Sequence, residues 1–66
     1  MRPQLTLREW DILVGLAMGQ KPRDVAADIG ISPQTVKNHL TSIYRKLEVD
    51  SLVGAFIALG WLRVPR

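Results

Sequence analysis

The sequence predicts an all-α fold: a compact domain of four helices at about residues 7–18, 22–29, 33–47 and 52–59. In the first three segments, apolar residues recur at intervals of three and four, which is the period of an amphipathic helix. Residues typical of helix ends flank the segments, with Thr, Ser, Asp or Pro before them and Gly after most of them. The chain has 66 residues and no cysteine. We therefore expect a single domain, residues 1–66, without disulfides.

The first helix has a capping signal at its start. Thr6 can accept the amide of Glu9, and the Glu9 carboxylate can reach back to the amide of Thr6, which is the reciprocal pattern of a capping box. Gly19 is the expected stop. The expected buried stripe consists of Trp10, Leu13, Val14 and Ala17, widened by Ile12, Leu16 and Met18. Trp10 and Trp61 are both expected to anchor the core.

The second and third helices each begin with proline. Pro22 and Pro33 suit the first helical position, because the N–H that proline lacks would have no partner within the helix there. Ser32 can cap the third helix, and Gly30 ends the second. The expected buried residues are Val25, Ala26 and Ile29 in the second helix and Val36, Leu40, Ile43, Tyr44 and Leu47 in the third.

The fourth helix, from Leu52 to about Leu59, is apolar on every side and contains no charged residue. Asp50 or Ser51 can cap it, and Gly60 is the expected stop. A helix that is hydrophobic on every side must be covered on every side. A chain of 66 residues has too few other helices to cover every side of this one, so one side stays uncovered. We expect a second copy of the chain to cover it, with burial against a further domain as the alternative. The expected interface residues are Val53, Ala55, Phe56 and Ile57.

The charges suggest a partner without identifying it. Nine Lys and Arg against six Asp and Glu give a net charge of +3. The middle of the chain is basic, and this indicates either a polyanionic partner or simply a solvated surface. Its cations are Lys21, Arg23, Lys37, Arg45 and Lys46, opposed there by Asp24 and Asp28.

Several classes of protein are excluded by what the sequence lacks. No apolar run reaches the roughly 18 residues of a membrane helix, and no apolar stretch of a signal peptide follows the first basic residue. We therefore expect a cytoplasmic protein. The single histidine, His39, cannot build a Cys and His zinc site and has no catalytic partner at a suitable spacing. We expect no enzymatic activity, metal, cofactor or small-molecule ligand, and we expect His39 at the edge of the buried stripe.

The second and third helices fit a helix-turn-helix. Ala26, Gly30 and Val36 stand at relative positions i, i+4 and i+10. The small Ala26 lets the helices approach, Gly30 can take the positive φ of a tight turn, and Val36 fills the angle between the helices. This arrangement places its second helix in the major groove of DNA. An ordinary αα-hairpin in a small bundle is the alternative.

The outer side of the third helix favours DNA. It carries hydrogen-bonding side chains and no acid: Gln34, Lys37, Asn38, Thr41 and Arg45. Lysine can pair with guanine N7 and O6, and asparagine can pair bidentately with adenine. A plain solvated helix face is the alternative.

A set of motifs covers nearly the whole chain, from about Leu5 to Ala58. The motifs are Leu5-Thr6-Leu7-Arg8-Glu9, Gly19, Asp24-Val25-Ala26, Ile31-Ser32, Thr35-Val36-Lys37-Asn38-His39, Ile43 and Lys46-Leu47 with Val49. This pattern resembles the LuxR-type (GerE-like) helix-turn-helix domain. The resemblance implies a bacterial or phage-encoded transcription regulator that binds double-stranded DNA through its third helix and forms a homodimer through its fourth.

The resemblance also implies roles for individual positions. It assigns base reading to Lys37, Asn38 and Thr41. It makes phosphate contacts plausible for Lys21, Arg23, Gln34, Thr35, Arg45 and Lys46. Two residues depart from the family pattern. Lys21 stands where a Ser cap is usual, which weakens that helix start, and Leu52 stands where Arg is usual.

Two questions of context stay open. The same fold can serve as a small protein-interaction module, such as an antagonist that binds another regulator, and this is the alternative function. The start Met1-Arg2-Pro3 favours a free-standing regulator over an output domain excised from a larger protein.

Overall fold

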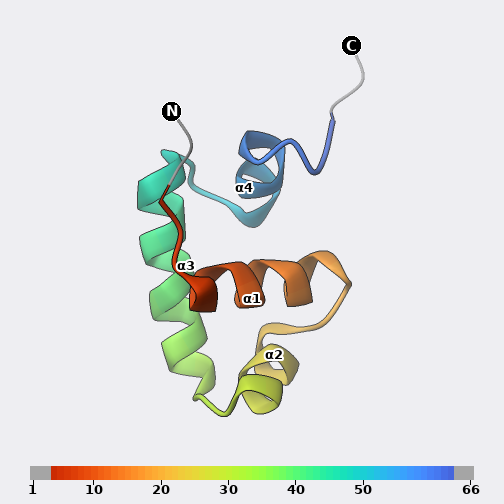
Figure 1. The fold of residues 1–66 in the computed structure, drawn as a ribbon, viewed down its shortest axis with the longest axis vertical. Coiled ribbons are helices and arrows are strands. Elements are labelled where there is room, and N and C mark those ends of the chain that lie inside the picture. Colours follow the sequence, from red (N-terminus) through yellow and green to blue (C-terminus); the bar gives the residue numbers. More distant parts are fainter. Residues whose placement is uncertain (1–3, 64–66) are drawn as a thin grey trace.

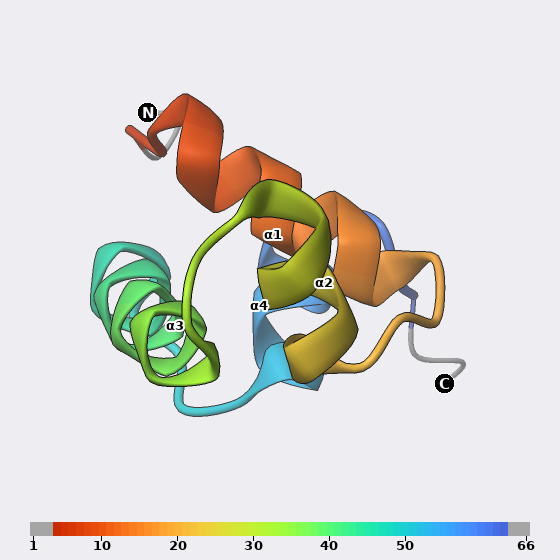
Figure 2. The same ribbon diagram turned by 90° about the horizontal axis from the view of Figure 1, so that it is seen from below.

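The computed structural model describes residues 4–63, so Met1-Arg2-Pro3 lies outside the described residues. In this range the chain forms four helices: α1 (Leu7–Ala17), α2 (Pro22–Ile29), α3 (Pro33–Leu47) and α4 (Leu52–Ala58). Helix α3 runs along one side of the molecule, with α1 extending from its middle and α2 and α4 near its opposite ends (Figure 1). Viewed from below, the other three helices lie to one side of α3 (Figure 2). The predicted all-α fold is confirmed, and α1 and α4 each end one residue earlier than expected.

Side-chain caps begin three of the four helices. Thr6 Oγ1 accepts the Glu9 N–H at 3.1 Å and Glu9 Oε1 accepts the Thr6 N–H at 2.8 Å, so the predicted capping box is present. Ser32 caps α3 and Ser51 caps α4, each by accepting the N–H of the residue three positions later, at 3.1 and 3.0 Å. Lys21 precedes α2 without a side-chain cap, as the missing Ser at that position predicts.

The turn between α2 and α3 has the geometry that the spacing predicted. Gly30 adopts the left-handed conformation, with φ 75° and ψ 32°, which a side chain with a Cβ atom would strain. The N–H of Ile31 donates to the carbonyl of Ala26 at 3.0 Å and closes the end of α2. Ala26 and Val36 are both buried at the corner. The two helices therefore pack closely and leave the far side of α3 uncovered.

The core lies between α3 and the other helices. Its largest fully buried side chains come from α1 and α3: Ile12, Leu13, Val36 and Ile43. Val25 and Ala26 of α2 and Ala55 of α4 are also buried. Leu40 and Leu52 are half-buried and pack against this core. The departure at Leu52 therefore places an apolar side chain where it joins the core of the domain.

The expected buried stripe of α1 is wrong at three positions: Val14, Ala17 and Met18 are exposed. Val14 and Met18, the residue that follows α1, share the solvent side of this helix with Leu7, which is also exposed. These three residues are separated by seven and four positions, which places them on one side of a helix. Helix α1 has apolar residues on two opposite sides, so its periodicity predicts a helix without showing which side faces the core.

Trp61 is also placed differently from the expectation. It follows α4 and is 43% exposed, so it does not anchor the core. Its ring lies 5.7 Å from that of the half-buried Trp10 and 5.8 Å from that of Phe56, measured between ring centroids. The three rings form a small cluster at the edge of the domain. Trp61 therefore shields the start of α1 and the end of α4 instead of filling the interior.

Candidate nucleic-acid interface

One side of α3 carries five polar residues that are all exposed, as predicted. These residues, termed the reading surface, are Gln34, Lys37, Asn38, Thr41 and Arg45. They lie opposite the buried Val36 and Ile43, so the packing of the core determines which side of α3 reaches solvent. Helix α3 contains no Asp or Glu at any position. The reading surface is thus rich in donors and carries no negative charge of its own.

Two hydrogen bonds order the side chains of the reading surface. Gln34 Nε2 donates to Asn38 Oδ1 at 3.1 Å, and Thr41 Oγ1 donates to the carbonyl of Lys37 at 3.1 Å. The Asn38 amide nitrogen keeps its donors, and its oxygen keeps a second lone pair. Asn38 can therefore present the donor and acceptor that pair with adenine while Gln34 holds its orientation.

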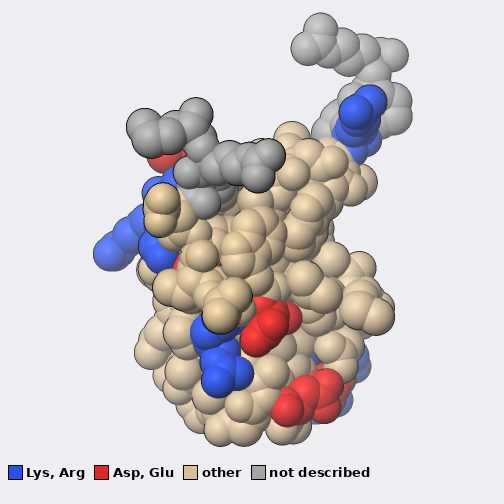
Figure 3. All heavy atoms as spheres, in the orientation of Figure 1, with Lys and Arg blue, Asp and Glu red and all other residues tan. Residues whose placement is uncertain are grey.

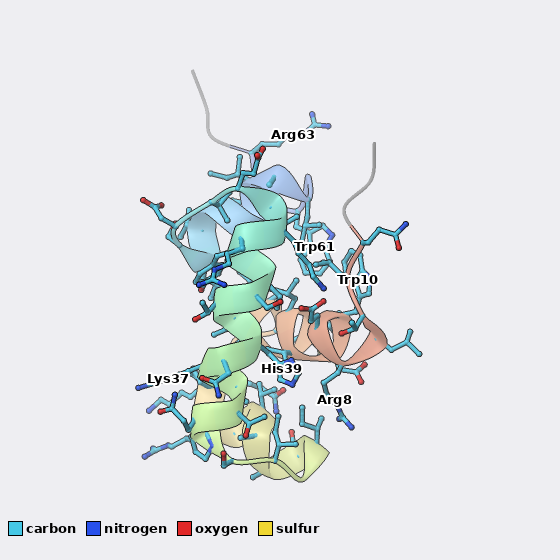
Figure 4. All side chains as sticks on the ribbon, turned by 90° about the vertical axis from the view of Figure 1, so that its left-hand side faces the viewer. Arg8, Trp10, Lys37, His39, Trp61 and Arg63 are labelled. Atoms are coloured by element: carbon cyan, nitrogen blue, oxygen red, sulfur yellow. The ribbon has the colours of Figure 1, made fainter. Side chains whose placement is uncertain are left out.

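Lys37 and the start of α1 lie on opposite sides of the molecule. With α3 toward the viewer, Lys37 projects from one side of it, whereas Arg8 of α1 projects on the other (Figure 4). His39 lies between α3 and α1 and is half-buried, the boundary position expected from the sequence. On the face where α1 lies, charged side chains are few, of both signs and scattered (Figure 3). The described residues therefore offer a polyanion no continuous basic surface on that face.

The other predicted phosphate contacts differ in their availability. Lys21 and Arg23, at the start of α2, are exposed. Thr35, in the first turn of α3, is half-buried, and its hydroxyl shares a 2.8 Å hydrogen bond with Ser32 Oγ. The N-terminal turn of α3 carries the positive end of the helix dipole, which favours a phosphate there.

Lys46 has a partner that the sequence analysis missed. Its Nζ lies 2.7 Å from Glu9 Oε1, in an ion pair between the last turn of α3 and the first turn of α1. Glu9 is only 2% exposed. Burial alone would raise the pKa of the Glu9 carboxyl, but Lys46, the Thr6 N–H and Ser42 outweigh it and hold that pKa below its ordinary value of 4.5. The capping box was the only local signal for Glu9, and nothing in a local pattern joins it to a residue 37 positions away.

The four residues expected at the interface of α4 do not share one side. Ala55 is fully buried, and the half-buried Phe56 packs against the core. The expectation is therefore wrong for Ala55, whose side chain faces the chain's own interior. Val53 and Ile57 are 56% and 41% exposed, and their spacing of four places them on one side of α4.

Within residues 4–63, no helix is long and apolar enough to cross a membrane. The same range holds no cluster of three or more His, Cys, Asp or Glu side chains that could bind a metal ion.

Comparison with known proteins identifies close sequence relatives. A family model described as GerE, bacterial regulatory proteins of the luxR family, matches residues 3–59. Transcriptional regulatory protein YdfI of Bacillus subtilis is 48% identical over 48 residues, covering 73% of this chain and 22% of that protein. Nitrate/nitrite response regulator protein NarP of Escherichia coli is 47% identical over 53 residues, covering 80% of this chain and 25% of that protein. Uncharacterized transcriptional regulatory protein YhcZ of Bacillus subtilis is 46% identical over 59 residues, covering 88% of this chain and 28% of that protein. The chain thus spans about a quarter of the length of these relatives.

The ion pair makes stability depend on pH in one direction. Because folding lowers the pKa of Glu9, the ionised carboxylate adds to the free energy of unfolding above pH 4.5. This contribution is lost as the pH falls through the lowered pKa. Glu9→Gln keeps an oxygen that can accept the Thr6 N–H but cannot ionise. The unfolding temperatures of the parent and of Glu9→Gln are measured from pH 7 to pH 2. The parent should unfold at the higher temperature at neutral pH, and the two unfolding temperatures should converge in acid. A constant difference between parent and variant across this range would contradict the assigned pair.

Proposed function

Since the chain belongs to the LuxR family of bacterial regulatory proteins, we propose that residues 1–66 form a single DNA-binding domain. This domain binds double-stranded DNA sequence-specifically, with α3 in the major groove. The observation that carries the proposal is the reading surface: five exposed polar side chains, without a carboxylate, on the side of α3 that the core cannot cover. A protein helix of this kind fits the width of the major groove. The activity is transcription regulation in the cytoplasm, without enzymatic chemistry.

Within the groove, three side chains read bases. Lys37 pairs with guanine N7 and O6, and Asn38 pairs with adenine through its amide. Thr41 contacts a base edge through its hydroxyl, which can still accept a hydrogen bond while it donates to the carbonyl of Lys37.

The phosphate contacts lie around these base-reading residues. They are made by Lys21, Arg23, Gln34, Thr35 and Arg45. They set the register of the helix on the duplex and make affinity depend on salt. Lys46 is left out of this set because Glu9 holds its ammonium group.

One observation favours a second candidate function. The solvent side of α1 exposes Leu7, Val14 and Met18, an apolar surface that DNA binding does not require. A protein-interaction module, such as an antagonist of another regulator, would use this kind of surface. Binding to duplex DNA at several salt concentrations distinguishes the two functions. A protein-interaction module would not bind the duplex at any salt concentration, whereas a DNA-binding domain binds it with an affinity that falls steeply with salt.

The roles of the reading surface can be tested by substitution. Lys37→Ala and Asn38→Ala should each cost about 1–3 kcal/mol of binding free energy on the preferred duplex and relax the preference at one base pair. Arg23→Ala should weaken binding to all sequences equally and flatten the salt dependence. Binding isotherms on the preferred duplex and its single-base variants measure both effects. The reading surface is wrongly assigned if Lys37→Ala and Asn38→Ala leave affinity and base preference intact.

We also propose that two copies pair on DNA through the exposed side of α4, where Val53 and Ile57 lie. Residues 4–63 provide no element that covers this apolar side, and a second copy would stabilise it by removing it from water. A twofold axis there would place the two α3 helices about 34 Å apart, one turn of DNA. One short helix per subunit buries little area, so DNA supplies the remaining affinity by linking two weak contacts.

Charged substitutions test this pairing. Val53→Asp and Ile57→Asp should abolish cooperative binding to a duplex with two half-sites and leave binding to a single half-site unchanged. Leu7→Asp is the matched control, because Leu7 is an exposed apolar residue of α1. Titrations followed by gel shift distinguish the singly and doubly bound duplexes. Cooperativity that survives both α4 substitutions would remove α4 from the interface.

A further inference from the structure

We infer that the Glu9–Lys46 ion pair positions α3 for base reading and withholds Lys46 from the DNA phosphates. The inference rests on the proposed function, because it concerns how the same helix is held. Glu9 is a positioning residue: it affects DNA binding only through α3, to which it is joined by its ion pair with Lys46.

A single carboxylate oxygen joins two helices. Glu9 Oε1 accepts both the Thr6 N–H at 2.8 Å, at the start of α1, and the Lys46 ammonium at 2.7 Å, in the last turn of α3. The Glu9 side chain is 3% exposed and that of Lys46 is 35% exposed, so the carboxylate is buried while the lysine side chain keeps part of its surface in solvent. Freeing Lys46 would leave a buried carboxylate without its counter-ion, which is strongly unfavourable.

This bond differs from the other polar contacts of the domain in its reach. It joins residues 37 positions apart, and Ser42 of α3 is a second side-chain hydrogen-bond partner of the same Glu9 carboxylate. Apart from these bonds to Glu9, the side-chain hydrogen bonds within residues 4–63 join residues at most eight apart. Apart from Glu9, the buried side chains that α1 and α3 contribute to the core, such as Ile12 and Ile43, are apolar, and apolar burial is not directional. A charged hydrogen bond is directional, so it can set the rotation of α3 about its own axis.

The rotation of α3 matters because base contacts tolerate little error. A binding side chain has to be held within about 0.5 Å of its productive position. Rotation of α3 would move Lys37 and Asn38 together, and with them the pairing to base edges. Contacts to phosphates tolerate more movement, because a flexible cation can follow the backbone. Loss of the ion pair should therefore reduce base preference more than it reduces general affinity for DNA.

The position of Lys46 on α3 agrees with this separation. Lys46 follows Ser42 by four residues and His39 by seven, so the three lie on the flank of α3 that faces α1. Arg45, one residue earlier, belongs to the reading surface and is exposed. The two adjacent cations thus have different tasks: Arg45 faces DNA, and Lys46 neutralises Glu9.

The first test compares these two neighbours. Binding of a random-sequence duplex is measured at several salt concentrations for the parent, Lys46→Met and Arg45→Met, at a temperature where each is shown to be folded by circular dichroism. Arg45→Met should flatten the slope of log K against log salt by about 0.9 for one lost phosphate contact. Lys46→Met should keep the parent slope. An equal flattening in both variants would overturn the inference, because Lys46 would then contact a phosphate.

The second test measures positioning directly. Affinity is measured for a selected preferred duplex and for the random-sequence duplex. Partial unfolding of a variant lowers both affinities by the same factor, so their ratio does not depend on the folded fraction. Glu9→Gln and Lys46→Met should lower this ratio at least about fivefold, the lower limit for losing one base contact. Lys46→Arg, which can keep the pair, should preserve it. A ratio that stays at the parent value in Glu9→Gln and Lys46→Met would show a purely stabilising role and overturn the inference.

The parent measurement separates the two levels of the argument. A parent that binds neither duplex at any salt concentration would overturn the proposed function and the positioning role together. A parent that binds, with Glu9→Gln and Lys46→Met keeping the parent's ratio of affinities, would overturn only the positioning role.

Discussion

The side of α3 that carries Val36 and Ile43 has to be removed from water, and the rest of the structure follows from how this is done. Both side chains are completely buried, and each contributes on the order of 1.5–3 kcal/mol to folding. Helices α1, α2 and α4 all lie on that side of α3 (Figure 2). The opposite side then stays in solvent along the whole helix. The chain therefore obtains its reading surface as a consequence of forming its core.

Helix boundaries and the helix-turn-helix could be predicted because their causes are local. Thr6 with Glu9, Ser32 and Ser51 each bond to a backbone group three residues away, so residue type at one spacing is sufficient evidence. Gly30 is required by the turn itself, since its φ is positive. The exposed polar side of α3 follows in the same way, because fixing one apolar stripe fixes the side opposite to it.

What could not be predicted depends on contacts between distant segments. Helices α1 and α4 are apolar on more than one side, so only the packed structure separates the exposed Val14, Met18, Val53 and Ile57 from the buried Leu13 and Ala55. The ion pair of Glu9 with Lys46 joins the two ends of the motif pattern and has no local signature. It removes Lys46 from the cations expected from the sequence to contact DNA phosphates, while the exposed Arg23 and Arg45 remain.

The central proposal is that the side of α3 left exposed by the core reads a defined DNA sequence, and that two copies of the chain do so as a pair. Selection of bound sequences from a library of random duplexes tests this directly, with bead-only selections as the control. We expect enrichment of an imperfect palindrome whose half-sites are centred about 10 bp apart, one turn of the duplex. Recovery of a single asymmetric half-site would contradict the pairing. A pool that stays indistinguishable from the input library after repeated rounds at low salt would contradict DNA reading itself.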